Sequence, residues 1–245
     1  MSVNSRSDRE REHFNALATD LGSVWWGSIT KAGQLRLDER AKLAIRYGGL
    51  SPGKVVLEPG AGNAEFTKRL AASGATIVGV EISPNQVAIA NERLIEFPKA
   101  KVVVGDINKL DFPDGTFDAI VGNAVLHHFD LITALPEMLR VLKPGGSFFF
   151  TEPNMLNPQI AVEKNIKFIG RALQNSPDET AFFRWQIDSI LKRNGFSRIW
   201  VKPFDFLHPG VPDSLIPFFQ KFSHFLSNIP VIKEIGGSLQ IYAQR

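Results

Sequence analysis

The 245-residue chain contains no cysteine. This absence excludes a disulfide-stapled scaffold, a cysteine-ligated zinc or iron–sulfur site, and a thiol nucleophile. The chain also lacks any apolar run approaching the ~18 residues that span a bilayer. Its first twenty residues are polar and charged, without the apolar segment of a signal peptide. We therefore expect a soluble, cytoplasmic protein.

A strong charge of either sign is also missing. The 28 lysines and arginines face 25 aspartates and glutamates, which leaves a net charge of +3. So small an excess does not call for nucleic acid or an anionic membrane as partner. We expect no nucleic-acid partner, no metal and no transmembrane segment, and peripheral membrane contact is not the favoured arrangement. The sequence gives no signal for an oligomeric state.

What the chain does contain is a regular alternation of short apolar runs and helical segments from residue 51 onward. The runs KVVLEPGAG, ATIVGVEIS, KVVVGDI, FDAIVGN and SFFFTEP are separated by segments with helical periodicity, and RIWVKPF and SLQIYAQR follow near the end. LITALPEMLRVLKPGG predicts a helix closed by its Pro-Gly-Gly sequence. Nearly continuous apolar strands between helices predict a parallel sheet covered on both faces.

The predicted fold class is therefore α/β, a Rossmann-like, seven-stranded, mostly parallel sheet with helices on both faces. Residues 1–50 predict a polar N-terminal helical cap, and residues 51–245 the main domain. Two insertions, at about 155–182 and 204–236, are expected on the substrate side. The second contains an apolar stripe at helical spacing, from Leu215 to Ile229. Such a stripe indicates core or a lid, with a surface for an acyl or isoprenoid substrate as the alternative.

The strongest chemical signal is VVLEPGAGNAEF, residues 55–66, where a strand ends in Glu58 and a turn with Gly60 and Gly62 leads into a helix. Glycines there let the backbone approach a ligand, although a tight turn without a ligand would use them too. Glu81 ends the next strand, 19 residues after Gly62, a spacing suited to binding both ribose hydroxyls. Together these features predict a nucleotide site.

The acidic residues around this turn discriminate between nucleotides. Glu65 stands where the dinucleotide fingerprint has its third glycine, and a carboxylate facing a pyrophosphate there is electrostatically unfavourable. Glu58 and Glu65 together suit a ligand that carries an ammonium and a sulfonium. S-adenosylmethionine is such a ligand, and a nicotinamide dehydrogenase is disfavoured.

LEPGAGNAEF, VVVGDINKLDFPDGTFDAIVGNAVLHHF and LRVLKPGGSFFFTEP, in this order, resemble the motifs of class I S-adenosylmethionine-dependent methyltransferases. The resemblance covers about residues 50–153 and is greatest to the small-molecule, methyltransferase type 11-like members. One departure is Ala64, where the family often has a third glycine. The cofactor site implied by the resemblance comprises Glu58, Gly60, Ala61, Gly62, Glu81, Ile82, Asp106, Ile107 and Asn123.

The resemblance also implies the role of each position in that site. The glycines would line the amino-acid moiety, with Glu58 close to its ammonium, and Glu81 would hold the ribose. Ile82 and Ile107 would flank the adenine, whose amino group Asp106 would bind. Asn123 would lie beside the methionine moiety.

The candidates for catalysis are His127 and His128, which follow the fourth predicted strand. A hydroxyl nucleophile must lose a proton, and histidine titrates in the useful range. The alternative for either histidine is packing or capping of the next helix. Further substrate contacts are expected from four residues, each with a structural role as its alternative: Trp26, Glu152, Asn154 and His208.

The predicted function is methyl transfer from S-adenosylmethionine to a small molecule, with an oxygen of a sugar or pathway metabolite as the preferred acceptor. A quinone- or sterol-like lipid acceptor is the alternative, and a non-catalytic S-adenosylmethionine-binding partner is a third reading. An enzyme that methylates nucleic-acid bases is disfavoured. Such enzymes have an Asp/Asn-Pro-Pro-aromatic pattern after the fourth strand, and this chain has NAVLHH there.

Overall fold

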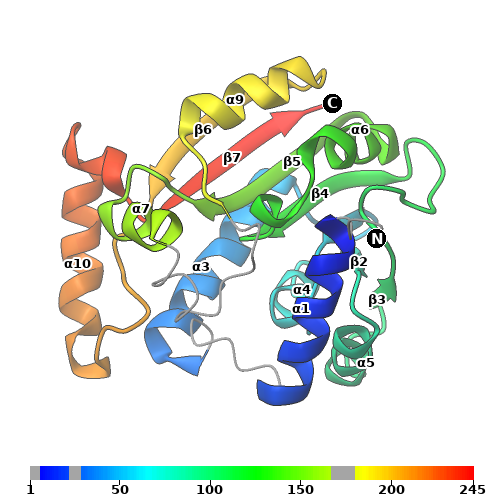
Figure 1. Cartoon of the computed structure of the whole chain (residues 1–245), viewed down its shortest axis with the longest axis horizontal. Helices are drawn as coiled ribbons and strands as arrows, with labels where there is room; N and C mark the ends of the chain where they lie inside the picture. The colour runs from blue at the N-terminus through cyan, green and yellow to red at the C-terminus, as the bar shows by residue number, and fades with distance from the viewer. Residues whose placement is uncertain (1–5, 22–28, 167–179) are drawn as a thin grey trace.

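The computed structural model describes residues 6–21, 29–166 and 180–245 (Figure 1). Trp26, a candidate substrate contact, lies outside the described residues. The helices are α1 (Arg6–Leu21), α3 (Lys31–Gly48), α4 (Glu65–Ala71), α5 (Pro84–Arg93), α6 (Leu131–Val141), α7 (Pro158–Asn165), α9 (Arg184–Arg193) and α10 (Ile216–Ser227). Short 3-10 turns are η1 (Leu126–His128), η2 (Asp213–Leu215) and η3 (Ile232–Ile235).

Seven strands form one sheet in the order β3-β2-β1-β4-β5-β7-β6. They are β1 (Val55–Pro59), β2 (Thr76–Glu81), β3 (Ala100–Val104), β4 (Phe117–Asn123), β5 (Leu142–Pro153), β6 (Ser197–Phe204) and β7 (Ser238–Gln244). The pairs among β1 to β5 are parallel, and β7 runs antiparallel to β5 and β6. The predicted fold class is confirmed.

One predicted boundary is wrong. The helix expected to end at residues 144–146 ends at Val141, and Leu142 already has an extended ψ of 134°. β5 then begins at Leu142. Pro144 is the physical reason, because a proline pushes the residue before it out of the helical region and so ends the helix upstream.

Three consecutive phenylalanines of β5 show how the sheet is buried on both faces. Phe148 and Phe150 pack with the core residues of α6 and α9, whereas Phe149 packs on the opposite face with α3 and α4. Side chains alternate between the faces of a strand, so an uninterrupted apolar run fits a sheet with helices on both sides. Figure 1 shows α6 and α9 across the sheet from α3 and α4.

The N-terminal helices play different parts. Ala41 and Ala44 of α3 belong to the same hydrophobic cluster as strands β1 and β4. α1 instead reaches the carboxyl ends of three strands: Ser7 bonds Asn108 after β3, Glu10 bonds His128 after β4, and Asn15 bonds Ser83 after β2. This edge of the sheet is where open α/β folds bind ligands.

Candidate active site

The glycine turn after β1 is held against β2 and η1. Gly60 N donates to Val80 O at 2.7 Å, and Gly60 has a φ of +63°. A Cβ built on Gly60 would lie 2.2 Å from Val125 Cγ2, whereas one on Gly62 would meet nothing within 4 Å. Gly60 is therefore required by close packing, and Gly62, at φ +52°, leaves open space beside the backbone.

Glu81 ends β2 with its carboxylate fixed beside this turn. Its Oε2 accepts from Gly62 N at 3.0 Å and its Oε1 accepts from Ser83 N at 2.9 Å. Burial raises the pKa of Glu81, and the backbone donors partly oppose that rise. Each carboxylate oxygen retains acceptor capacity for a ribose hydroxyl.

Glu58 lies deeper at the end of β1. It is buried, and its Oε2 has no hydrogen-bond partner among the described residues. Burial raises the pKa of Glu58 to about 8, with the nearby Thr67 hydroxyl opposing and Glu81 adding to the rise. An orphaned buried acceptor beside an open glycine turn fits the ammonium of an amino-acid moiety.

Glu65 does not face the turn as the sequence argument assumed. Its carboxylate pairs with Arg69 at 2.9 Å and with Arg93 at 2.7 Å. Because two guanidiniums neutralise the Glu65 carboxylate, its charge is not an argument against a pyrophosphate at this turn. Ala64, at the departure from the family pattern, has a φ of +67°, the left-handed region that a glycine would adopt without strain.

The other predicted cofactor residues lie at the same edge. Asp106 Oδ1 accepts from both the backbone N and the Nδ2 of Asn108, each at 2.9 Å. Ile107 is buried and Ile82 is half-buried. Asn123 ends β4, and its Oδ1 accepts from Thr151 Oγ1 at 2.8 Å. The sheet thus gathers the predicted residues from β1, β2, β3 and β4.

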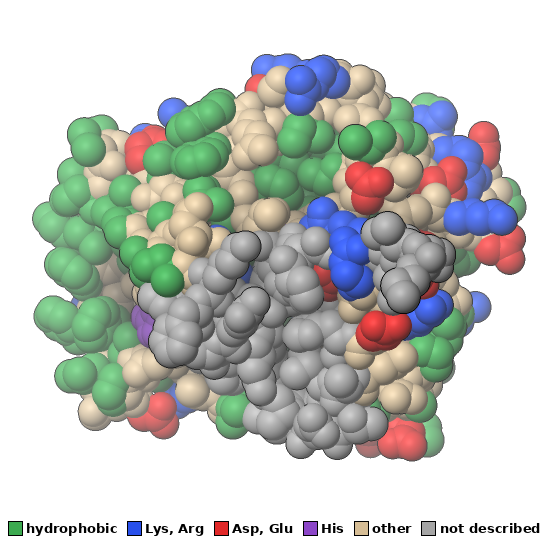
Figure 2. Space-filling view, viewed as in Figure 1, with side chains coloured by type: hydrophobic (Ala, Val, Ile, Leu, Met, Phe, Trp, Pro, Cys, Tyr) green, Lys and Arg blue, Asp and Glu red, His purple; other side chains and the backbone are tan. Residues whose placement is uncertain are grey.

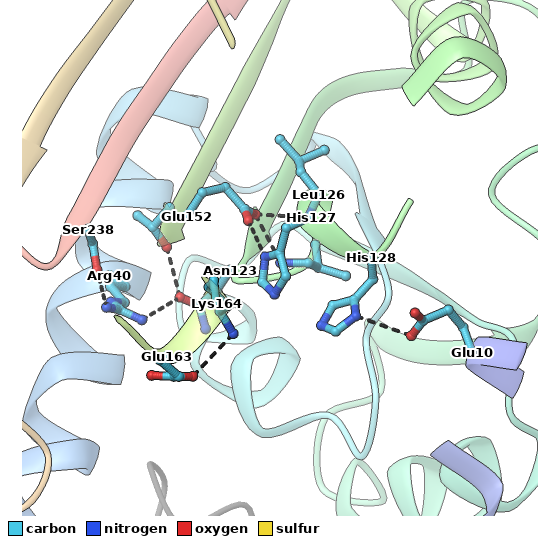
Figure 3. A network of polar contacts seen from close by, with 12 residues as sticks. Glu10, Arg40, Asn123, Leu126, His127, His128, Glu152, Glu163, Lys164 and Ser238 are labelled. Carbon is cyan, nitrogen blue, oxygen red and sulfur yellow. Dashed lines mark hydrogen bonds and ion pairs between the residues drawn. The ribbon is translucent and has the colours of Figure 1, made fainter. Parts of the chain in front are cut away.

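The two histidines after β4 are held by different carboxylates (Figure 3). His127 is buried, with Nδ1 2.6 Å from Glu152 Oε2, while Glu152 Oε1 accepts from Val125 N and Leu126 N, both at 2.9 Å. Glu152 is buried at the end of β5. This carboxylate selects the tautomer of His127 with the proton on Nδ1, so Nε2 carries the lone pair.

His128 turns toward α1 instead. Its Nδ1 lies 3.1 Å from Glu10 Oε2, and its ring centroid is 4.2 Å from that of His127. Arg6 of α1 also donates to the backbone oxygen of His127 at 2.6 Å. His127 is thus held by Glu152 of β5, whereas His128 links η1 to α1 at the edge of the sheet.

A buried cation, Arg40 of α3, was missed by the sequence argument. It donates to Asn123 Oδ1 at 3.1 Å, to Asp205 Oδ2 at 3.0 Å and to Ser238 Oγ at 2.6 Å, and its Nε has no partner among the described residues. Burial lowers the pKa of Arg40 to about 10, so it stays charged at neutral pH. Nothing in the charged N-terminal sequence distinguishes this arginine from its neighbours.

The remaining two substrate candidates lie in different surroundings. Asn154 is fully buried, its Nδ2 donates to Glu234 O and Gly236 O, and its Oδ1 accepts from Leu156 N, which favours the structural alternative. His208 is exposed and lies 2.9 Å from Gln159 Nε2 of α7. Partial burial of its ring and the charge of Arg36 lower the pKa of His208.

Within the described ranges, no group of three or more histidines, aspartates or glutamates is placed to hold a metal ion. No helix in these same ranges is long and apolar enough to cross a membrane.

Comparisons with known proteins identify the family of this chain. Residues 57–150 match the family described as "Methyltransferase domain". A demethylmenaquinone methyltransferase from Mycobacterium sp. (strain JLS) is 32% identical over 179 residues, 70% of this chain and 75% of that protein. A 2-methyl-6-phytyl-1,4-hydroquinone methyltransferase from Synechocystis sp. (strain ATCC 27184 / PCC 6803 / Kazusa) is 40% identical over 106 residues, 41% of this chain and 33% of that protein.

Among solved structures, the [4+2]-cyclase SpnF superimposes with a TM-score of 0.72 at 19% identity, covering 99% of this chain and 97% of that one. At that identity the likeness concerns the fold alone. The motifs, the sheet and the relatives together define an enzyme that transfers a methyl group. The chain belongs to the class I S-adenosylmethionine-dependent methyltransferases, with S-adenosylmethionine as its cofactor.

Proposed function

We propose that this methyltransferase acts on a lipid-like hydroquinone, with His127 as the general base. The observation that carries the proposal is the buried His127–Glu152 pair, 2.6 Å between Nδ1 and Oε2, at the edge of the sheet where Asn123 also lies. A hydroxylated aromatic ring needs such a base, and two relatives are named demethylmenaquinone methyltransferase and 2-methyl-6-phytyl-1,4-hydroquinone methyltransferase. The quinone alternative of the sequence argument thereby takes precedence over a sugar oxygen.

Bound S-adenosylmethionine supplies an activated methyl group on a sulfonium. The chain's own task is to orient the acceptor, to exclude water and to accept a proton. His127 Nε2 takes the proton of the acceptor hydroxyl, and the electron pair left behind makes the ring nucleophilic. The new carbon–carbon bond forms as the carbon–sulfur bond breaks. The ring C–H proton then passes to water, which restores aromaticity, and His127 Nε2 returns the first proton to the acceptor oxygen.

Glu152 is a positioning residue in this scheme. It holds the His127 ring and stabilises the imidazolium that forms, while two backbone N–H groups hold Glu152 itself. Arg40 contributes a buried positive charge that bonds Asn123, and it would lower the cost of negative charge on the acceptor oxygen. Lys164 of α7, with a nearly buried side chain, pairs with Glu163 at 3.2 Å, and Figure 3 shows this pair near Arg40 and Asn123.

We also propose which residues hold the cofactor. Glu58 would receive the ammonium, Gly60, Ala61 and Gly62 would line the amino-acid moiety, and Glu81 would hold the ribose. Ile82, Asp106 and Ile107 would surround the adenine, and Asn123 would border the methionine moiety. Residues 1–50 would act as a helical cap on the domain formed by residues 51–245.

The test is an acceptor panel with methyl-labelled S-adenosylmethionine. Reduced prenylated naphthoquinol and benzoquinol in detergent would be compared with sugars and with simple phenols. The expected result is label in the extracted hydroquinone, with the carbon position assigned by mass spectrometry. Label only in a sugar, or only on oxygen, would contradict the proposed acceptor.

A further inference from the structure

α10 presents an unusual amount of aromatic surface to solvent. Phe218, Phe222 and Phe225 are 63%, 42% and 60% exposed, and Leu215 just before the helix is 46% exposed. Phe218 and Phe222 stack on each other with ring centroids 6.0 Å apart. Figure 2 shows hydrophobic side chains gathered along the left edge, over the position of α10 in Figure 1.

The opposite side of α10 is firmly attached to the domain. Ile216 is buried in a cluster with Ala32 and Leu207, and Phe219 packs against that cluster. Ala32 belongs to α3, the helix that also carries Arg40 into the active-site network. The exposed aromatic face therefore belongs to a helix whose other side packs against α3, next to the proposed acceptor side.

The charges on this face point to the kind of surface it meets. α10 contains no aspartate or glutamate, and its Lys221 is exposed; one exposed acid, Asp213, stands on η2 before the helix. Lys233, on the adjoining η3, is exposed as well, beside the 80% exposed Val231. Aromatic side chains with lysines at their border are the composition of helices that lie in a membrane interface, attracted by anionic lipids.

We propose that α10 is a membrane-docking helix that inserts Phe218, Phe222 and Phe225 into the surface of an anionic bilayer. This inference rests on the proposed function, because a lipid-like hydroquinone has to be drawn from a membrane. It also departs from the sequence expectation, in which membrane contact was not favoured. A second copy of this chain is the competing occupant, and the test below separates the two.

The experiment is co-sedimentation of the full chain with vesicles of phosphatidylcholine, alone or mixed with phosphatidylglycerol, without quinone or cofactor. The test variant is Phe218→Ser/Phe222→Ser/Phe225→Ser. The matched control is Ile95→Ser/Ile132→Ser, which removes two apolar side chains that are each 83% exposed elsewhere. Circular dichroism verifies the fold of each variant.

We expect the wild type and the control to bind mixed vesicles, and the triple variant to bind about tenfold or more weakly. A separate Lys221→Glu/Lys233→Glu variant should lose binding to mixed vesicles as well. Vesicle binding unchanged in the triple variant, or absent in the wild type, would overturn the inference. A wild-type dimer that the triple variant converts to monomer, without vesicle binding, would assign the face to a second copy.

These outcomes are independent of turnover. Hydroquinone methylation in detergent without vesicle binding would overturn the docking helix and leave the proposed function standing. Vesicle binding that depends on the three phenylalanines, without hydroquinone methylation, would overturn the proposed function and leave the docking helix standing.

Discussion

Replacing Glu58 by glutamine tests whether this buried carboxyl receives the ammonium of the cofactor. With a pKa of about 8, about nine-tenths of the Glu58 side chains are protonated at pH 7 in the unliganded protein. A bound ammonium favours the charged carboxylate. Cofactor binding at pH 7 should therefore expel close to one proton from Glu58.

Calorimetric titration in buffers of different ionisation enthalpy measures that proton directly. Glu58→Gln should abolish the release attributable to the protein and weaken binding, because the amide offers no charge to the ammonium. Glu65→Gln is the matched control, since that carboxylate pairs with Arg69 and Arg93 instead. Equal proton release by the wild type and Glu58→Gln would refute the assignment.

The same pKa makes a prediction about stability. Because the pKa is raised from 4.5 in the folded state, the stabilisation associated with protonated Glu58 is complete below about pH 4.5 and is lost as pH rises through about 8. Over that range the unfolding free energy of the wild type should fall relative to Glu58→Gln by about 1.4 kcal/mol per pH unit, an upper bound. Urea denaturation of both proteins across the range measures the difference.

Three further predictions concern other parts of the molecule. Glu152→Gln should cut kcat by about a hundredfold and shift the pH–rate profile, while a circular dichroism spectrum and cofactor affinity stay near wild type; an unchanged profile would contradict its positioning role. Asp205→Asn should cost about 3–5 kcal/mol at pH 7 by leaving Arg40 without its carboxylate. Burial alone would raise the pKa of Asp205, but Arg36 and Arg40 lower it, so this cost should shrink as pH falls below about 4 in urea denaturation. Gly60→Ala should destabilise the protein by more than Gly49→Ala, which meets nothing within 4 Å and should cost about 1–2 kcal/mol for its φ of +65°; equal costs would show that Val125 moves aside.

The fold, and the meeting of the β1 and β2 strand ends, could be predicted because their sequence signals are local. A strand that ends in an acid, a glycine turn and a second acid at a fixed spacing specify adjacent strand ends, and β1 and β2 do place Glu58 and Glu81 together. The apolar β5 run also predicted a sheet with two covered faces. Each of these features depends on residues within one strand or one βαβ unit.

The features that the sequence did not predict depend on contacts between distant segments. Arg40 reaches Asn123 across 83 residues of sequence, and His127 meets Glu152 across 25. The periodicity of residues 215–229 predicted a helix, but it did not say which neighbour would cover its apolar side. The sequence argument also misjudged Glu65. Its place in the motif suggested a free negative charge, but Arg93, 28 positions away, neutralises it.

The central claim is that methyl transfer depends on the His127–Glu152 pair, and single-turnover kinetics test it most directly. The rate of label transfer from bound S-adenosylmethionine to the hydroquinone would be measured for the wild type, His127→Gln and His128→Gln. We predict that His127→Gln is slower by about a hundredfold or more with unchanged cofactor affinity, and that His128→Gln retains most of the rate. A wild-type rate in His127→Gln would contradict the account.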